Sequence, residues 1–221
     1  MILLAIECSS DERSVAVARD GEVIASDTRR SGRSTPLLGM IEGILQAAHL
    51  DRSEVEALAV GLGPGSYTGI RGSIAVAQGW SLATGARLVG IDSSAACAHR
   101  AHRLDVRGLV AIVIDAQRGE WYVATHKLDE DGVHALSPLR IATRAEVEEL
   151  AHAGFQLAGP DLPTPLLAGR TANPDATSVA MLARDCRTWV RPEQLEPIYL
   201  RPTTFVKAPP PRNPQSPDPN P

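Results

Sequence analysis

The stretch from Gly61 to Thr84 has a density of glycine that few folded segments tolerate. Its first twelve residues contain five glycines, and the pattern predicts a helix from about Ser66 onward. Each glycine inside a helix costs about 1 kcal/mol relative to alanine, so Gly69, Gly72 and Gly79 need a reason beyond stability. One hypothesis is that the glycine-rich loop holds an anion at the helix N-terminus. The other is that small residues on one helix face allow another backbone to approach closely.

Composition places the chain among globular proteins of moderate size. With 221 residues it can form one large domain or two small ones around a proper core. The net charge of −4 makes RNA binding by the isolated chain an unfavoured hypothesis. Cys8, Cys97 and Cys186 are odd in number and lack CxxC spacing, which indicates reduced thiols. No apolar run approaches the roughly 20 residues of a membrane span, so we expect a soluble, cytoplasmic protein.

The two halves of the chain repeat one order of elements. Each half reads as an apolar strand, an acid, a turn, a second strand, an Asp-Gly turn, a third strand and a helix; the acids are Glu7 and Asp115. An internal duplication constrains the whole fold and predicts two related α/β lobes. The expected strands are 1–6, 14–18, 22–26, 57–60, 87–90, 109–114, 120–126 and 133–136, and the expected helices are 36–49, 66–84, 94–103, 143–153 and 178–188.

The domain boundaries follow from this duplication. We expect a first lobe over residues 1–107, which carries the partner-binding helices, and a less regular second lobe over 108–207. Residues 208–221 contain seven prolines in fourteen positions and are predicted to be a disordered tail. The carboxyl ends of strands 1–6 and 109–114 should face a cleft between the lobes, where ligands sit in open α/β sheets.

Residues at this predicted cleft are candidates for nucleotide or anion contacts. The loop lacks the Gly-Lys-Ser/Thr ending of a P-loop, so a structural turn is favoured over phosphate binding. A carboxylate at the strand end could hold a hydrated magnesium ion or could accept hydrogen bonds from loop amides. Both hypotheses stay open for Asp115, and the second is favoured for Glu7. The candidate contacts are Glu7, Ser9, Gly63, Gly65, Ser66 and Asp115.

The sequence predicts neither a metal site nor a catalytic residue. The six histidines include no pair four residues apart on a helix and no HExxH. No Gly-x-Ser-x-Gly supports a hydrolase nucleophile.

Helices 36–49 and 66–84 are expected to lie side by side and to present one surface. Ser34 or Thr35 can cap the first, with Pro36 at its first position. Its apolar stripe is wide enough to face both its own sheet and a partner. The alternative is that both stripes belong entirely to the core. The expected partner-interface residues are Leu37, Leu38, Ile41, Leu45, Gly69, Gly72, Val76, Gly79 and Trp80.

Four segments together resemble one known family. They are ILLAIECSS at the start, VGLGPGSYTGIRGSIAVAQGWSLAT, IDAQRGEWYVA and PIYLRP, in this order between Met1 and Pro202. They are similar to the TsaB (YeaZ) family, the small accessory subunit of bacterial tRNA threonylcarbamoyladenosine synthesis. Two positions depart from that family, because Glu7 stands where Asp is usual and Arg33-Ser34-Thr35 replaces a His-Ser-Glu-like segment.

The resemblance implies a fold and a set of partners. The fold is the actin-like ATPase fold (ASKHA, ribonuclease H-like), with mixed sheets flanked by helices. The function is that of a non-catalytic subunit that pairs with a larger paralogue, TsaD, which threonylcarbamoylates adenosine 37 of tRNAs reading ANN codons. An ATPase, TsaE, joins them, and tRNA is met only through the complex. No cofactor of its own is implied, with ATP and Mg²⁺ only in the assembled complex, and a homodimer can form when the paralogue is absent.

The alternative function is an independent ATP-using enzyme of the actin-like or sugar-kinase class. The larger paralogue carries a metal-binding His-x-x-x-His in its first-lobe helix, whereas helix 34–49 here has no such pair. The missing histidine pair and the missing phosphate-binding lysine favour the partner subunit.

Overall fold

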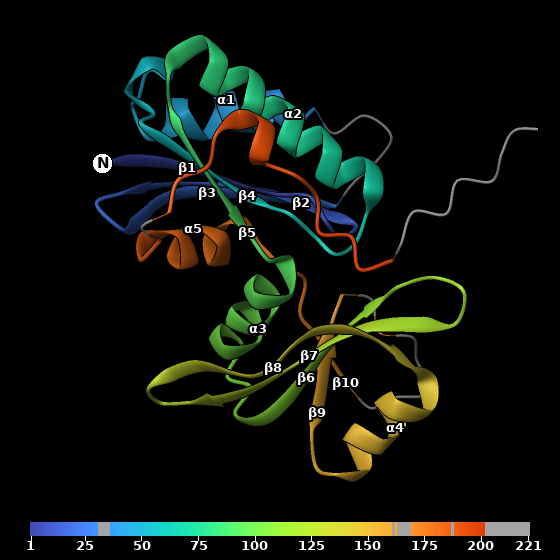
Figure 1. Ribbon diagram of the computed structural model, residues 1–221. Coiled ribbons are helices and arrows are strands. Elements are labelled where there is room, and N and C mark those ends of the chain that lie inside the picture. The colour runs from blue at the N-terminus through green and yellow to red at the C-terminus, as the bar shows by residue number, and fades with distance from the viewer. Residues whose placement is uncertain (31–35, 161, 163–168, 187, 202–221) are drawn as a thin grey trace, which may run out of the picture.

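The computed structural model describes residues 1–30, 36–160, 162, 169–186 and 188–201 (Figure 1). The predicted cap at Ser34 or Thr35 and the predicted tail over 208–221 lie outside these residues. The described chain forms two lobes, each built on a five-stranded sheet.

The first sheet has the strand order β3-β2-β1-β4-β5. Strand β1 runs antiparallel to β2 and parallel to β4. The turn between β2 and β3 has positive φ at Asp20 (52°) and Gly21 (88°), as the predicted Asp-Gly hairpin requires. The strands are β1 Ile2–Glu7, β2 Glu12–Arg19, β3 Glu22–Arg30, β4 Ala57–Gly61 and β5 Arg87–Ile91.

The second sheet has the order β10-β9-β6-β7-β8, which reproduces the first when it is written from β8 to β10. Strand β6 runs antiparallel to β7 and parallel to β9, as β1 does to β2 and β4. The prediction of two related α/β lobes is therefore confirmed. The strands are β6 Gly108–Asp115, β7 Glu120–Asp129, β8 Gly132–Thr143, β9 Gln156–Gly159 and β10 Gly169–Thr171.

The helices cover the two sheets unequally. In the first lobe, α1 and α2 lie on one face of the sheet and α5 lies on the other (Figure 1). The predicted capping box of Thr143 and Glu146 begins α4. The helices are α1 Leu37–Ala47, α2 Tyr67–Thr84, α3 Ser93–Arg103, α4 Arg144–His152 and α5 Ala176–Arg184, with short 3₁₀ turns at Arg52–Glu54 and Pro192–Gln194.

Two strands of the second lobe, β9 and β10, were not among the expected elements. Strand β9 was not expected, because its four residues QLAG are too short to show a strand pattern. It forms because residues 156–158 pair with the buried β6. Only nine residues, 160–168, separate β9 from β10, whereas α2 fills the corresponding connection of the first lobe with 18 residues.

The last helix of each half packs across the lobe boundary. Helix α3 contacts the strands β6 to β9 of the second sheet, and α5 returns to β1 and β2 of the first. Helix α5 fits there because alanines of the sheet and of the helix leave room for close packing, with Ala5 and Ala16 facing Ala176 and Ala180. The second lobe therefore does not extend over 108–207 as expected, since α5 packs on the first sheet; a bridge between Leu88 and Val190 also joins the chain after α5 to the first sheet.

Asp175 connects these two crossing helices. It caps α5 by accepting a hydrogen bond from Ser178 N at 2.8 Å. Its carboxylate also binds Arg100 at 2.9 Å and Arg103 at 3.0 Å, both on α3, and its side chain is only 9% exposed. Because one buried carboxylate serves both helices, we expect it to matter more than a surface ion pair.

Replacing Asp175 should weaken the union of the lobes. Asp175→Ala removes a helix cap and leaves two arginines without their partner, so the free energy of unfolding should fall by about 1–3 kcal/mol. Urea denaturation measures this. Asp185→Ala is the matched control, because Asp185 directly follows the same helix and has a 77% exposed side chain; equal losses in the two variants would show that Asp175 has no special role.

Candidate functional site

A cleft of about 650 Å³ lies between the lobes, where the turn after β1, the start of α2 and the end of β6 meet. Of the six expected anion contacts, four line it: Ser9, Gly65, Ser66 and Asp115. Glu7 and Gly63 are not among its lining residues. The full lining is Ser9, Ser10, Asp11, Gly65, Ser66, Tyr67, Ile114, Asp115, Ala116, Gln117, Tyr122 and Pro160.

Glu7 is fully buried behind the cleft. One carboxylate oxygen accepts a hydrogen bond from Ser9 N at 2.6 Å, and the other accepts one from Ser93 Oγ at 2.7 Å. A Cβ at Gly61 would lie 1.9 Å from the carboxylate, so only glycine fits there. Burial raises the pKa of Glu7, while the hydrogen bonds from Ser93 and Ser9 lower it. Glu7 therefore does not face the cleft as a nucleotide contact would, because its two carboxylate oxygens accept hydrogen bonds from Ser9 and Ser93 inside the protein.

Ser93 extends the Glu7 contact to the glycine loop. Its hydroxyl oxygen also accepts a hydrogen bond from Gly63 N at 3.0 Å, and its own N–H donates to Gly63 O at 2.9 Å. Gly63 is thus held by α3 rather than presented to the cleft. Sequence reasoning missed Ser93 because 86 residues separate it from Glu7, and no local pattern marks the pair.

The glycines at the start of α2 allow the turn after β1 to lie against the helix. A Cβ at Gly65 would lie 2.0 Å from Ser9 O, and one at Gly69 would lie 2.0 Å from Cys8 O. Ser66 N donates to Ser9 O at 2.6 Å, and the Ser66 side chain caps the helix by accepting from Gly69 N. Protein groups therefore occupy much of this helix N-terminus, which supports the structural hypothesis for these glycines.

Asp115 is exposed at the opposite wall of the cleft. Its carboxylate accepts hydrogen bonds from Gln117 N at 2.7 Å and from Gln117 Nε2 at 2.9 Å. Asp11 is a second carboxylate that lines the cleft. Among the residues that the structure describes, no three His, Cys, Asp or Glu side chains form a group that could hold a metal ion.

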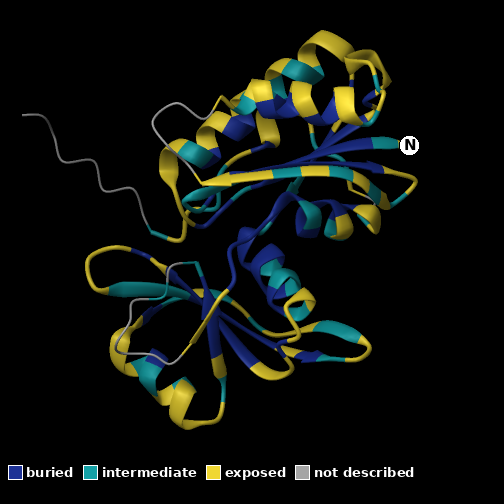
Figure 2. Ribbon diagram, turned by 180° about the vertical axis from the view of Figure 1, so that it is seen from behind, coloured by how far each residue is buried: buried dark blue, intermediate teal, exposed yellow. Residues whose placement is uncertain are grey.

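The outer face of α1 and α2 forms the second candidate site. The two helices lie on the same face of the first sheet (Figures 1 and 2). A groove of about 230 Å³ runs between them. Leu38 is 61% exposed and Leu82 76% exposed. At Gly72 and Gly79 a Cβ would meet no atom within 4 Å. The groove is lined by Leu38, Ile41, Glu42, Arg52, Trp80, Ala83 and Thr84.

Two of the expected interface residues are buried within the lobe. Ile41 is 1% exposed and Leu45 3% exposed, because the apolar stripe of α1 packs onto its own sheet. Leu37, Val76 and Trp80 are partly buried against the same core. Gly69 is explained by its contact with Cys8 O. The outward-facing members of the expected set are therefore Leu38, Gly72 and Gly79, with the partly buried residues beside them.

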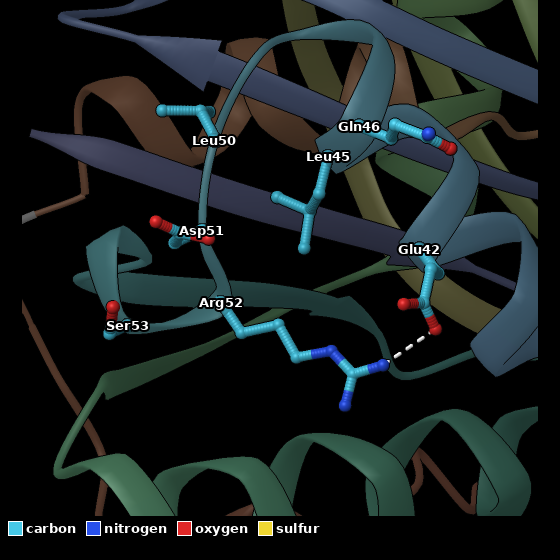
Figure 3. Close-up of a pocket in the computed structure, with 7 residues that line it drawn as sticks. All are labelled: Glu42, Leu45, Gln46, Leu50, Asp51, Arg52 and Ser53. Carbon is cyan, nitrogen blue, oxygen red and sulfur yellow. Dashed lines mark hydrogen bonds and ion pairs between the residues drawn. The ribbon is translucent and has the colours of Figure 1, made fainter.

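A larger open hollow of about 670 Å³ adjoins this groove (Figure 3). Glu42 and Arg52 line both, and their side chains meet at 2.6 Å. Both side chains are 65% exposed, so this ion pair contributes little to stability. The hollow has polar and apolar walls and extends the surface beside α1. Its lining residues are Glu42, Leu45, Gln46, Leu50, Asp51, Arg52 and Ser53.

Comparison with known proteins places this arrangement in a family. The family model described as TsaD, tRNA N6-adenosine threonylcarbamoyltransferase, matches residues 29–167. A solved structure of YeaZ from Pseudomonas aeruginosa superposes with a TM-score of 0.75 at 29% identity and covers 90% of this chain and 99% of that one. The chain belongs to the TsaB (YeaZ) family.

Curated relatives agree with this assignment over part of their length. The tRNA threonylcarbamoyladenosine biosynthesis protein TsaB of Escherichia coli is 35% identical over 60% of this chain, and its Haemophilus influenzae namesake is 33% identical over 55%. The matches span 58% and 52% of those relatives, little more than half of each. The resemblance seen in the sequence is thus confirmed, and so is the actin-like α/β fold of two mixed sheets flanked by helices.

Two further observations bear on this TsaB-family chain. Within the described ranges, none of the helices combines the length and apolarity needed to cross a bilayer. Tyr122 and Asp11 line the cleft, and Ser93 holds Gly63 behind it; none of the three was singled out from the sequence. Asp11 alone had a local signal, since it stands in the polar turn after the first apolar strand.

The buried Glu7 should make stability depend on pH. A raised pKa means that the folded state holds a proton that the unfolded state releases, so stability falls as pH rises above the ordinary value of 4.5. Glu7→Gln removes this titration. We expect wild type to lose stability relative to the variant between pH 4.5 and the raised pKa, as measured by urea denaturation across that range.

The comparison between the two proteins isolates Glu7. Burial lowers the pKa of His99 and His126, which makes stability rise with pH, but both proteins share this effect and it cancels in the difference. Parallel stability curves for wild type and Glu7→Gln would contradict the raised pKa.

Proposed function

We propose that this chain is a non-catalytic partner subunit for threonylcarbamoylation of adenosine 37 in tRNAs that read ANN codons. It would act by pairing with the catalytic paralogue TsaD, with the ATPase TsaE joining the assembly in the cytoplasm. The printed names of its relatives, which place them in tRNA threonylcarbamoyladenosine biosynthesis, support this role. The chain would need no cofactor of its own, and ATP and Mg²⁺ would serve the assembled complex.

The observation that carries this proposal is the pair of open glycines on α2. Gly72 and Gly79 are exposed and seven residues apart on one helix face, and apart from their chain neighbours and the nearby backbone of α2 no atom of the described chain lies within 4 Å of the position of a Cβ. Each costs about 1 kcal/mol relative to alanine. No contact within the lobe requires glycine at these two positions. We infer that glycine is present there because it lets another molecule approach the helix closely.

The surroundings of these glycines suit a helical partner. The groove between α1 and α2 and the exposed Leu38 and Leu82 offer apolar surface on the same face of the lobe. A small-residue stripe allows helices to pack at the short end of the usual 8–10 Å separation. The match to the TsaD family model supports a partner with related helices. The same face would let two copies of this chain pair when the paralogue is absent.

The state of Glu7 supports a role without catalysis. A carboxylate at the end of the first strand would need to reach the cleft to take part in nucleotide chemistry. Here Ser9 and Ser93 hold it inside, and Gly61 lies directly against it.

Filling the glycine stripe should separate pairing from folding. Gly72→Leu should keep the monomer folded, because the side chain enters open space. It should reduce co-purification with the paralogue at least tenfold and lower tRNA modification by the reconstituted complex accordingly. Val76→Glu is a poorer probe, because Val76 packs partly against the core.

Ala151→Leu is the matched control, since it enlarges an exposed position on α4 in the other lobe. Circular dichroism establishes that each variant is folded. Normal pairing and tRNA modification by folded Gly72→Leu would place the interface elsewhere.

The alternative is an independent ATP-using enzyme, and the cleft itself favours it. The cleft is large enough for a nucleotide and has Asp11 and Asp115 in its walls.

We expect the isolated chain neither to hydrolyse ATP at a useful rate nor to modify tRNA. The measurement is phosphate release by wild type and by Asp115→Ala, with Asp131→Ala as the control on an exposed turn. Robust turnover that only Asp115→Ala abolishes would favour the enzyme over the partner subunit.

A further inference from the structure

All three tyrosines of the chain line one hollow. The sequence contains only Tyr67, Tyr122 and Tyr199, and aromatic residues make up 4% of it. They gather around a hollow of about 180 Å³ at the mouth of the interlobe cleft. Tyr67 and Tyr122 line the cleft as well, so the two spaces adjoin. This convergence comes from three distant parts of the chain.

The hollow is assembled from both lobes and a connecting segment. Tyr67 begins α2 in the first lobe, Tyr122 lies on β7 in the second, and Tyr199 belongs to the segment 197–201, here named the interlobe strap. Ile198 N on the strap donates to Leu62 O of the first lobe at 2.9 Å. Arg201 on the strap donates to Gln117 O at 3.1 Å and to the carboxylate of Glu120, both in the second lobe. The position of Tyr199 is therefore fixed from both sides.

The tyrosine rings are accessible. Tyr67 is 59% exposed and Tyr199 49% exposed. Their ring centroids lie 6.1 Å apart with planes tilted by 35°. Half-exposed aromatic rings at the edge of a hollow leave faces on which another planar ring can stack.

One cation accompanies the rings. The Arg71 guanidinium lies 5.2 Å from the centre of the Tyr67 ring and donates to the Tyr67 hydroxyl at 3.2 Å. A hydrogen bond with Tyr199 raises the pKa of Arg71, so the guanidinium stays charged. Within the described residues, the groups that act on the Arg71 guanidinium are Tyr199 and Tyr67 and not a carboxylate, so its charge is available to an anion.

We propose that the tyrosine hollow holds one unpaired nucleotide, with its base against the tyrosine rings and its phosphate at Arg71. The combination of stacking faces and a guanidinium is how proteins hold single-stranded nucleic acid. The hollow has room for one planar ring system, and the adjoining cleft has room for a ribose. A phosphate would be repelled by Asp115 in the cleft, which places it on the Arg71 side.

The nucleotide can be a residue of a single-stranded RNA loop or a free mononucleotide. The RNA source rests on the proposed function in tRNA modification, whereas the free nucleotide does not. The acidic net charge of the chain keeps such binding weak in isolation, because sequence-independent affinity comes from basic charge.

Fluorine NMR of the full chain tests this site directly. Incorporating fluorotyrosine gives three resonances, one for each tyrosine, and all three report on the hollow. Tyr→Phe variants assign them. At low salt, adenosine monophosphate or a short single-stranded RNA should shift all three resonances in a saturable way. If both ligands shift the resonances, a free mononucleotide is enough to occupy the hollow. If only the RNA shifts them, the bound nucleotide must be part of an RNA strand.

Arg71→Ala should weaken the apparent affinity about threefold to fivefold. Arg19→Ala is the matched control, because Arg19 is an exposed arginine at the far end of β2; it should leave the affinity unchanged. The proposal is overturned if neither ligand shifts the resonances, if Arg71→Ala has no effect, or if only the purified paralogue shifts them. The Gly72→Leu pairing test is independent, so failure of this site leaves the proposed pairing standing.

Discussion

The buried carboxylate of Glu7 is the interaction on which the arrangement of the cleft depends. Burying an acid costs free energy unless hydrogen bonds satisfy it, and here Ser9 and Ser93 do so from two different segments. Ser93 in turn holds Gly63, and Gly61 has no side chain because the carboxylate occupies that space. The first strand, the glycine loop and α3 are therefore set relative to one another by one side chain that faces away from solvent.

The glycines around α2 fall into two physical classes. Gly61, Gly65 and Gly69 each lie against another group of the chain, so a methyl group at any of them would collide. Gly72 and Gly79 collide with nothing and still carry the helix penalty. Sequence alone showed only a stripe of small residues and left both hypotheses open. In the structure, contacts with other parts of the chain explain Gly61, Gly65 and Gly69 but not Gly72 and Gly79.

Local patterns in the sequence were enough to predict most of the fold. Apolar runs marked the buried strands, Asp20-Gly21 marked a hairpin, and the repeated order of elements predicted two lobes. Patterns that depend on a distant partner were not visible: QLAG at β9 became a strand only because β6 lies beside it. Ile41 and Leu45 belong to an apolar stripe whose buried side is decided by the position of the sheet. The meeting of three tyrosines likewise depends on the tertiary fold.

The crossing of α3 and α5 has a consequence for how the chain is made. Ala5, Ala16 and Ala57 of the first sheet are covered by α5, which ends at Arg184. During synthesis from the N-terminus, that apolar face stays open until α5 has been made, although the first lobe's own strands are complete by residue 91. Exposed apolar surface on a nascent chain invites aggregation. The first lobe therefore cannot complete its core until α5, from the second half of the chain, has been synthesised.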